Sequence, residues 1–301
     1  MAGRPPQEGV HQDVLGVIGI TLGDTAGIGP EIVRLALDSG KLDPAFSYRV
    51  IGELPPRPAG APSPATARAA LDALETAARF AGKGEIAAVV TGPINKHRMQ
   101  EIGFLFPGQT EFFAARSGTE NFAMLLTGGA LTVALVTVHV PLKDVPALLK
   151  ESEIIRVGKL LAKFVTLRKG SAGRIAVAGL NPHAGESGAM GREEIEIIAP
   201  AVQKLGVGFH GPVSPDTVFH RAAKGEFDAV LCMYHDQGLI PLKLHAFDEG
   251  VNVTLGLPYV RTSPDHGTAF EIAWKGIARP DSMIAAINVA AELVKKRMLA
   301  N

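Results

Sequence analysis

Three of the histidines stand where runs of apolar, β-branched residues end. His139, His183 and His235 each close such a run, and each run is predicted to be a buried strand. In open α/β sheets, ligands gather at the carboxyl ends of the strands. Three imidazoles brought together there could hold one metal ion and leave a fourth position open for catalysis. They could equally be polar caps over strand ends, because the chain has no compact HExxH pair to decide between these roles.

Two acidic residues lie close to these histidines or to predicted turns. Asp236 directly follows His235, and Asp216 stands in the sequence Ser214-Pro215-Asp216-Thr217. Either carboxylate could complete a metal shell or orient a ligand from behind. For Asp216, a helix N-cap or turn position explains the pattern equally well.

A cationic group occupies the segment after the last of these histidines, which is predicted to form short strands and turns. It contains the cations Lys243 and Arg261 and, between them, the neutral amide of Asn252. Lysine and arginine supply point-charge and forked donors for phosphate or carboxylate. The alternative is solvated surface charge, which fits Arg261 less well because it follows the apolar run 257–260. Lys96, at the end of another predicted strand, is a similar case.

A Gly-rich turn over 23–29 leads from a predicted strand into a predicted helix. Such a turn aims backbone N–H groups at an anion. It matches neither the Walker A pattern nor the GxGxxG dinucleotide fingerprint. A literal GxGxxG occurs at 206–211, but it follows a helical pattern and runs into Pro212, so it lacks the strand–turn–helix context of a nucleotide site.

The elements that must position these residues alternate between short β-branched runs and longer helical patterns. This alternation predicts an α/β fold with a parallel or mixed sheet. Strands are expected over 14–22, 48–52, 86–91, 131–140, 174–180, 227–234 and 251–255. Helices are expected over 29–39, 64–82, 152–168, 192–205, 269–274 and 281–299. The apolar window 122–140 contains a Thr-Gly-Gly turn, which favours two short strands over a membrane span.

The composition is that of an ordinary globular protein of about two domains, with 301 residues, 47% hydrophobic and 20% charged. Thirty Lys and Arg balance thirty Asp and Glu, which argues against binding to nucleic acid or to an acidic membrane surface. The single cysteine, Cys232, excludes an internal disulfide and a Cys-rich zinc site and favours a cytoplasmic location. The first 12 residues lack the features of a signal peptide.

Taken together, the motifs resemble the 4-hydroxythreonine-4-phosphate dehydrogenase family of vitamin B6 biosynthesis. The resemblance covers almost the whole chain from about residue 14, and several motifs follow one another in order. They are Gly23-Asp24 through Pro30-Glu31, Thr91-Gly92-Pro93, Thr110-Glu111-Phe112-Phe113, His139-Val140-Pro141-Leu142, Asn181-Pro182-His183-Ala184-Gly185-Glu186, Tyr234-His235-Asp236-Gln237-Gly238, 250–258 and 261–268.

The resemblance implies a two-lobed α/β fold like that of isocitrate and isopropylmalate dehydrogenases, with mixed sheets and a central cleft. We expect residues 14–120 and 262–301 to form the first lobe. Residues 121–261 are expected to form the second lobe and to carry most of the metal and substrate residues. The resemblance also implies a homodimer with its active sites at the subunit interface.

The implied cofactors are NAD(P), bound without a Rossmann fingerprint, and one divalent metal ion per site. Imidazole ligands favour zinc, with cobalt or magnesium as alternatives. The implied metal ligands, drawn from both subunits, are His139, His183 and His235. The implied substrate contacts are Gln109, Thr110, Lys243, Asn252 and Arg261. The residues expected to move a proton or to act beside the metal are Lys96, Asp216 and Asp236.

The implied reaction is oxidation of 4-phosphooxy-L-threonine followed by decarboxylation to 3-amino-2-oxopropyl phosphate. The family usually has histidine where this chain has Gln109, and glutamine cannot exchange a proton near pH 7. Either this position only forms hydrogen bonds, or the substrate differs. The alternative substrates are a four-carbon sugar-acid phosphate, such as threonate or erythronate 4-phosphate, and a dihydrodiol acid. More distant alternatives are a three-histidine metal hydrolase and a non-catalytic binding protein.

Overall fold

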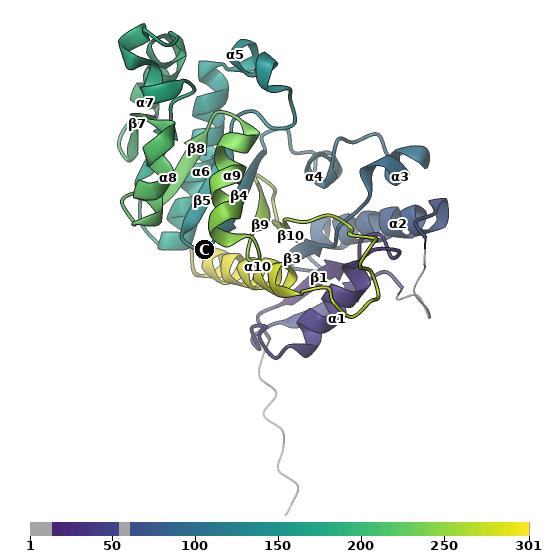
Figure 1. Ribbon diagram of the computed structural model, residues 1–301. Helices are drawn as coiled ribbons and strands as arrows, with labels where there is room; N and C mark the ends of the chain where they lie inside the picture. The colour runs from purple at the N-terminus through teal and green to yellow at the C-terminus, as the bar shows by residue number, and fades with distance from the viewer. Residues whose placement is uncertain (1–13, 54–60, 301) are drawn as a thin grey trace, which may run out of the picture.

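The computed structural model of the protein describes residues 14–53 and 61–300. The N-terminal tail and part of the proline-rich connection over 53–66 lie outside these residues. Within them, ten strands form one mixed sheet in the order β2-β1-β3-β10-β9-β4-β5-β8-β6-β7 (Figure 1). The strands are β1 (Val17–Thr21), β2 (Ser47–Ile51), β3 (Ala88–Thr91), β4 (Ala123–Gly128), β5 (Leu131–Leu135), β6 (Ile175–Ala178), β7 (Phe209–Val213), β8 (Ala229–Cys232), β9 (Val251–Leu255) and β10 (Val260–Pro264).

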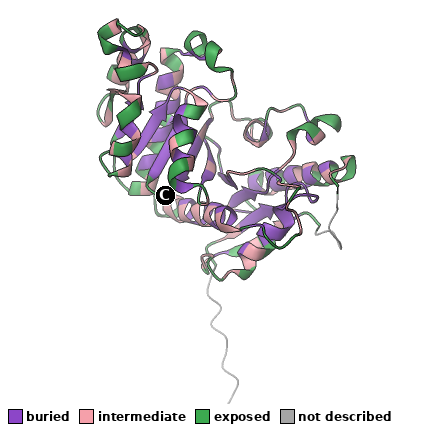
Figure 2. Cartoon of the chain, in the orientation of Figure 1, coloured by how far each residue is buried: buried purple, intermediate pink, exposed green. Residues whose placement is uncertain are grey.

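Helices cover both faces of this sheet, so that the strands are largely buried and the exposed residues lie on the outer sides of the helices (Figure 2). The α-helices are α1 (Gly29–Asp38), α2 (Pro64–Gly82), α3 (Lys96–Glu101), α4 (Gln109–Arg116), α5 (Val145–Leu148), α6 (Glu151–Lys169), α7 (Ala199–Leu205), α8 (Pro215–Ala223), α9 (His235–Ala246) and α10 (Asp281–Ala300). Three short helical turns complete the chain: η1 (Leu142–Asp144), η2 (Pro182–Gly188) and η3 (Glu194–Ile198).

The two faces of the sheet are covered differently. On one face, α1, α10, α6 and α7 pack into a single hydrophobic core that runs from one end of the sheet to the other. On the opposite face the cover is split. There α2 and α4 enclose one core at the first end, while α8 and α9 enclose another at the second end. The middle of the sheet is therefore open on this face.

Side-chain alternation along β9 and β10 places polar residues on the open face. Successive side chains of a strand point to opposite faces. Val251, Val253 and Val260 belong to the continuous core. Their neighbours Asn252 and Arg261 therefore point the other way and line a cavity there.

The two ends of the sheet are joined by the antiparallel pair β9–β10. Only three positions pair, Thr262 with Val253, Ser263 with Asn252 and Pro264 with Val251. Helix α10 contacts α6 as well as β3 and β10, and so it bridges the same junction from the continuous face (Figure 1). The predicted division into lobes at 120/121 and 261/262 stays a prediction, and its second boundary falls within β10.

Most elements expected from the sequence are confirmed, including the two strands within 122–140, which pair antiparallel as β4 and β5. The helix expected over 269–274 is wrong. That stretch forms consecutive turns in which Ala269 and Trp274 have positive φ angles. The backbone N–H of Trp274 donates to the buried carboxylate of Glu31 at 2.9 Å, a distant contact that no local pattern encodes.

The segment around Lys243 also differs from the expectation of short strands and turns, because it forms helix α9. Pro241 lies inside this helix, where proline is normally disfavoured, and this obscures the helical pattern. Helix α8 and strand β7 are likewise not expected from the sequence, whereas β10 agrees with the short strands expected around Arg261. Across 14–53 and 61–300, no helix combines the length and the apolar character needed to cross a membrane.

The close approach of two turns on this scaffold gives a stability prediction. A Cβ atom on Gly92 would lie 2.5 Å from the carbonyl carbon and oxygen of Leu22. We expect Gly92→Ala to lower the free energy of unfolding by about 1–3 kcal/mol through overpacking, measured by urea denaturation. Gly82→Ala is the matched control, since a Cβ there meets no atom within 4 Å and should not destabilise the protein. Equal urea midpoints for Gly92→Ala and wild type would contradict the packing of these turns.

Candidate active site

A cavity of about 620 Å³ occupies the open middle of the sheet. Its wall is formed by the ends of β3 and β10, by part of β9, by the first turn of α4 and by the loop after β5. The structure thus brings together many of the residues that the sequence singled out. The predicted site residues that line this cavity are Lys96, Gln109, Thr110, His139, Asn252 and Arg261.

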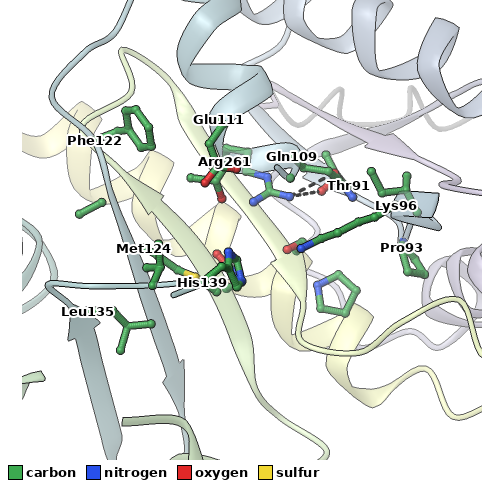
Figure 3. A pocket seen from close by; sticks show the side chains of 18 of the residues that line it. Thr91, Pro93, Lys96, Gln109, Glu111, Phe122, Met124, Leu135, His139 and Arg261 are labelled. Carbon is green, nitrogen blue, oxygen red and sulfur yellow. Dashed lines mark hydrogen bonds between the residues drawn. The ribbon is translucent and has the colours of Figure 1, made fainter. Parts of the chain in front are cut away.

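Arg261 is the most deeply buried charge in this wall, with 2% of its surface exposed. Its guanidinium donates to Thr91 Oγ1 at 2.6 Å, to Gln109 Oε1 at 3.1 Å and to Thr254 Oγ1 at 3.3 Å. Figure 3 shows the first two of these bonds beside the cavity. All three acceptors are neutral, and the buried Nε has no partner among the described residues.

The buried positive charge of Arg261 makes the cavity suitable for binding an anion. Burial lowers the pKa of the guanidinium to about 10, so it remains a cation at neutral pH. A buried charge is costly unless an opposite charge compensates it. No carboxylate of the described residues forms an ion pair with Arg261, although Glu111 lies near enough to raise its pKa. A phosphate or carboxylate in the cavity would supply the missing counter-charge, and a guanidinium matches either group with two parallel hydrogen bonds.

Gln109 holds Arg261 in place. Its Nε2 donates to the carbonyl oxygen of Gly92 at 3.0 Å, and its Oε1 accepts from Arg261. Both polar ends of the amide are therefore engaged by the protein. This arrangement supports the interpretation that position 109 forms hydrogen bonds without exchanging a proton.

Other polar atoms on the wall are left for a ligand. The Oδ1 atom of Asn252 and the Nε2 atom of His266 are buried and have no hydrogen-bond partner within 14–53 and 61–300. Buried polar atoms are nearly always paired, so such orphans point to a missing ligand or water. The hydroxyl oxygen of Thr110, which also lines the cavity, lies 3.4 Å from that of Thr254.

Two of the predicted metal ligands stand side by side. The ring centroids of His139 and His235 are 5.5 Å apart, and both rings line a smaller adjoining cavity of about 200 Å³. His139 lines both cavities, so the two spaces meet at its ring. Asp236 Oδ1 lies 2.7 Å from Nδ1 of His235, which leaves Nε2 of that ring for a metal.

The charge state of His139 also suits a metal ligand. Partial burial lowers the pKa of its ring, and the positive charges of Lys96 and His235 lower it further, while Glu111 acts in the opposite direction. A neutral imidazole is the form that binds metals. The ring pair therefore fits a divalent ion.

His183 and Asp216 lie apart from this pair. His183 is exposed in the turn η2, which contacts helix α8, and Asp216 is in the first turn of α8. A hydrogen bond from Ser214 lowers the pKa of Asp216, and the charge of His183 adds to this effect. Over the described ranges, no group of three or more His, Cys, Asp or Glu residues lies close enough to hold a metal.

Lys243 does not line the larger cavity either. Its Nζ lies 3.4 Å from Oδ2 of Asp265. Burial raises the pKa of Asp265, and the positive charge of Lys243 offsets part of this increase. Asp265 and Glu111 are charged residues of this region that the sequence argument did not select. Glu111 directly follows Thr110, and Asp265 lies in the same motif as Arg261, so membership in these motifs is the signal that could have identified them.

Comparison with known proteins identifies the family. Residues 36–290 match the family described as pyridoxal phosphate biosynthetic protein PdxA. The chain belongs to this family. It is 44% identical to the 4-hydroxythreonine-4-phosphate dehydrogenase of Desulforapulum autotrophicum, over 91% of this chain and 94% of that protein. The crystal structure of the enzyme of the same name from Klebsiella pneumoniae superposes with a TM-score of 0.78 at 37% identity, covering 93% of this chain and 99% of that one.

Two further solved structures are similar to this chain at lower sequence identity. A terephthalate 1,2-cis-dihydrodiol dehydrogenase from Burkholderia xenovorans has a TM-score of 0.66 at 27% identity, covering 92% of this chain and 98% of that one. Isocitrate dehydrogenase from Methylococcus capsulatus has a TM-score of 0.52 at 16% identity, covering 94% and 85%. The second likeness shows the fold alone, and it confirms the expected isocitrate-dehydrogenase-like architecture.

The environment of His139 gives a prediction that nuclear magnetic resonance can check. In the metal-free protein, we expect its ring to titrate below the ordinary histidine value of about 6.5, because burial and Lys96 both oppose its protonation. Lys96→Met should move the pKa upward but not fully back, since burial is the larger cause. Lys143→Met, on the following loop, should leave it unchanged. A wild-type value at or above 6.5 would refute this description of the site.

Proposed function

We propose that this chain catalyses the NAD(P)-linked oxidation of 4-phosphooxy-L-threonine and the decarboxylation of the product to 3-amino-2-oxopropyl phosphate. The observation that carries the proposal is the buried Arg261, which meets only neutral acceptors on the wall of a cavity of about 620 Å³. Arg261 binds the phosphate or the carboxylate of the substrate, and Lys243, which lies outside this cavity beside Asp265, is proposed as the second positive charge. The names of the relatives support the same reaction.

In this proposal one divalent ion, zinc by preference and cobalt or magnesium as alternatives, is held by His139, His183 and His235. The closeness of the His139 and His235 rings, 5.5 Å apart, and the lowered pKa of His139 support the assignment. The bound ion supplies a Lewis acid for the oxygen of the reacting carbon. Because His183 stands apart in this chain, we propose that the ligand set is completed across two subunits.

The remaining polar residues orient the substrate and move its protons. Thr110 and Asn252 offer a hydroxyl and an unpaired amide oxygen to the substrate. Lys96, or one of Asp216 and Asp236, relays the proton released from the substrate hydroxyl. Asp236 also orients the ring of His235 through their 2.7 Å contact.

The nicotinamide cofactor is proposed to bind against the loop that follows β10. The Nε2 atom of His266 in this loop is buried without a partner on the cavity wall. The turn at 23–29 lies against the same loop, since the backbone N–H of Ile28 donates to the carbonyl oxygen of Thr268 at 2.9 Å. This pairing of loops takes the place of a Rossmann turn. We propose a cytoplasmic location, which the single buried free thiol of Cys232 supports.

The outer side of α9 supports a homodimer with active sites at its interface. Ile240, Leu244 and the following Phe247 are 65%, 88% and 73% exposed, and their spacing places them on one side of the helix. An exposed apolar stripe of this kind marks an interaction surface, and a self-complementary one forms a twofold dimer. The same helix carries His235 and Lys243, so the interface and the site are adjacent.

This interface gives a second test of the proposal. We expect Leu244→Glu to convert dimers into monomers, because a charge would be buried at the contact, and to reduce dehydrogenase activity; analytical ultracentrifugation and an NAD(P)H assay measure both. The control is Leu105→Glu, which changes a residue that is 90% exposed outside α9 and should leave the dimer intact. A Leu244→Glu protein that remains dimeric would exclude this face.

The competing substrates are a four-carbon sugar-acid phosphate and a dihydrodiol acid. Gln109 in place of the usual histidine supports them, as does the likeness to a dihydrodiol dehydrogenase. Comparing NAD(P)H formation on 4-phosphooxy-L-threonine, threonate 4-phosphate and a dihydrodiol acid separates the three. Turnover of none of them would refute the proposed dehydrogenase function.

The role of Arg261 predicts a specific kinetic effect. Lysine cannot reproduce the forked contact, so Arg261→Lys should raise KM for the substrate about 10- to 100-fold, which corresponds to losing about 1.5–3 kcal/mol of charged hydrogen bonding. Steady-state kinetics with saturating cofactor measure the effect. Arg168→Lys is the control, since Arg168 pairs with Glu292 away from the cavity. An unchanged KM in Arg261→Lys would show that another group binds the anion.

A further inference from the structure

We propose that Glu194 and Gln237 act together as positioning residues that fix the backbone carrying His183. The inference rests on the proposed function, in which His183 is a metal ligand. Neither side chain is among the residues that line the two cavities of the candidate site. Both are buried, with 2% and 7% of their surfaces exposed.

The turn that carries His183 has an unusual backbone. The φ angles of His183, Ala184, Glu186 and Ser187 are 52°, 52°, 44° and 56°, so these residues are left-handed although none is glycine. A Cβ atom disfavours this conformation at every such position. Backbone of this kind persists only where its surroundings hold it, and it concentrates at functional sites. The question is which groups hold it.

Glu194 holds the turn from within. One carboxylate oxygen, Oε1, accepts from the backbone N–H groups of Leu180 at 2.7 Å and Asn181 at 2.8 Å. The other, Oε2, accepts from the side-chain amide of Asn181 at 3.0 Å. A Cβ atom on Gly185 would lie 2.6 Å from Oε2, which shows that the carboxylate fills the inside of the turn. One buried side chain thus bonds the start of the segment 180–185 and fills the space beside its end.

Gln237, in the first turn of α9, holds the same chain end from the other side. Its Oε1 accepts from the backbone N–H of Met233 at 2.7 Å, and its Nε2 donates to the carbonyl oxygen of Gly179 at 2.7 Å. The amide therefore ties the end of β8 to the end of β6. Gln237 lies two residues after His235, so one side chain links the turns that carry two predicted metal ligands.

Together the two side chains form hydrogen bonds to three successive residues, Gly179 to Asn181, immediately before the His183 turn; we call this set of hydrogen bonds the grip. Gln237 takes the carbonyl group and Glu194 takes the two amides. Each side-chain oxygen and nitrogen of Glu194 and Gln237 has a hydrogen-bond partner, an arrangement that favours an ordered strand end before any ligand binds. The grip would place the His183 ring in a fixed direction and so lower the cost of ordering it when a metal binds.

The test measures metal binding directly. We expect metal-free Glu194→Gln protein to bind Co²⁺ about 10- to 100-fold more weakly than wild type in isothermal titration calorimetry, the usual effect of removing a supporting group. The new amide would place an NH₂ group against the amide of Asn181. Glu196→Gln is the matched control, because Glu196 lies on the same turn but is exposed and pairs with Arg192. Its Co²⁺ affinity should equal that of wild type.

A second variant changes the other side chain of the grip, Gln237. Gln237→Glu places a carboxylate oxygen against the carbonyl oxygen of Gly179 and should weaken Co²⁺ binding in the same direction. If Glu194→Gln fails to fold in thermal denaturation, Gln237→Glu decides by the same criterion. His183→Ala combined with Glu194→Gln should bind Co²⁺ no more weakly than His183→Ala alone, because the grip acts through that ring.

The outcomes distinguish the positioning role of Glu194 and Gln237 from the proposed role of His183 as a metal ligand. Folded Glu194→Gln and Gln237→Glu proteins that bind Co²⁺ like wild type, beside a His183→Ala protein that does not, would overturn the positioning role and leave the metal assignment standing. A His183→Ala protein with wild-type Co²⁺ affinity would overturn the metal assignment, and the positioning role with it.

Discussion

The burial of one uncompensated cation governs the arrangement of this site. Arg261 lies on a strand at the middle of the sheet, where 2% of its surface is exposed and its acceptors are the hydroxyls of Thr91 and Thr254 and the amide of Gln109. Thr91 on β3 and Gln109 on α4 are distant from Arg261 in the sequence, whereas Thr254 lies on the adjacent strand β9. Neutral partners orient the guanidinium without neutralising it, so its charge remains available to an anionic ligand.

The unequal covering of the sheet makes that placement possible. A single core on one face holds the ten strands together, while the opposite face is packed only at its two ends. At the open middle, only three residue pairs join β9 to β10. Polar side chains can point outward there because the other face supplies the hydrophobic burial. One face of the sheet is therefore covered by a continuous hydrophobic core, and the middle of the other face carries the cavity with its polar residues.

The fold was largely predictable from local patterns, and the site only in part. Alternating β-branched and helical runs predicted the α/β class and most elements, because periodicity reflects which face is buried. Helix α9 and the turns over 269–274 were predicted wrongly, since Pro241 hides the first and a long-range bond from Trp274 to Glu31 imposes the second. Glu194 gave no signal, and Gln237 gave only its place in the motif at 234–238, because nothing in the local sequence distinguishes a buried polar side chain from an exposed one.

By itself, the sequence determined which residue types are available for chemistry and where they stand along their strands. It placed His139, His183, His235 and Arg261 next to strand ends or within strands, and a single cysteine left any metal site to histidine and carboxylate. Only the tertiary structure decided which of them meet. His139 and His235 are neighbours because β5 and β8 pair in parallel, whereas His183 follows β6, the next strand, in a turn that long-range hydrogen bonds hold. Strand order and burial arise from contacts between distant segments, and those contacts set the charge and direction of each side chain.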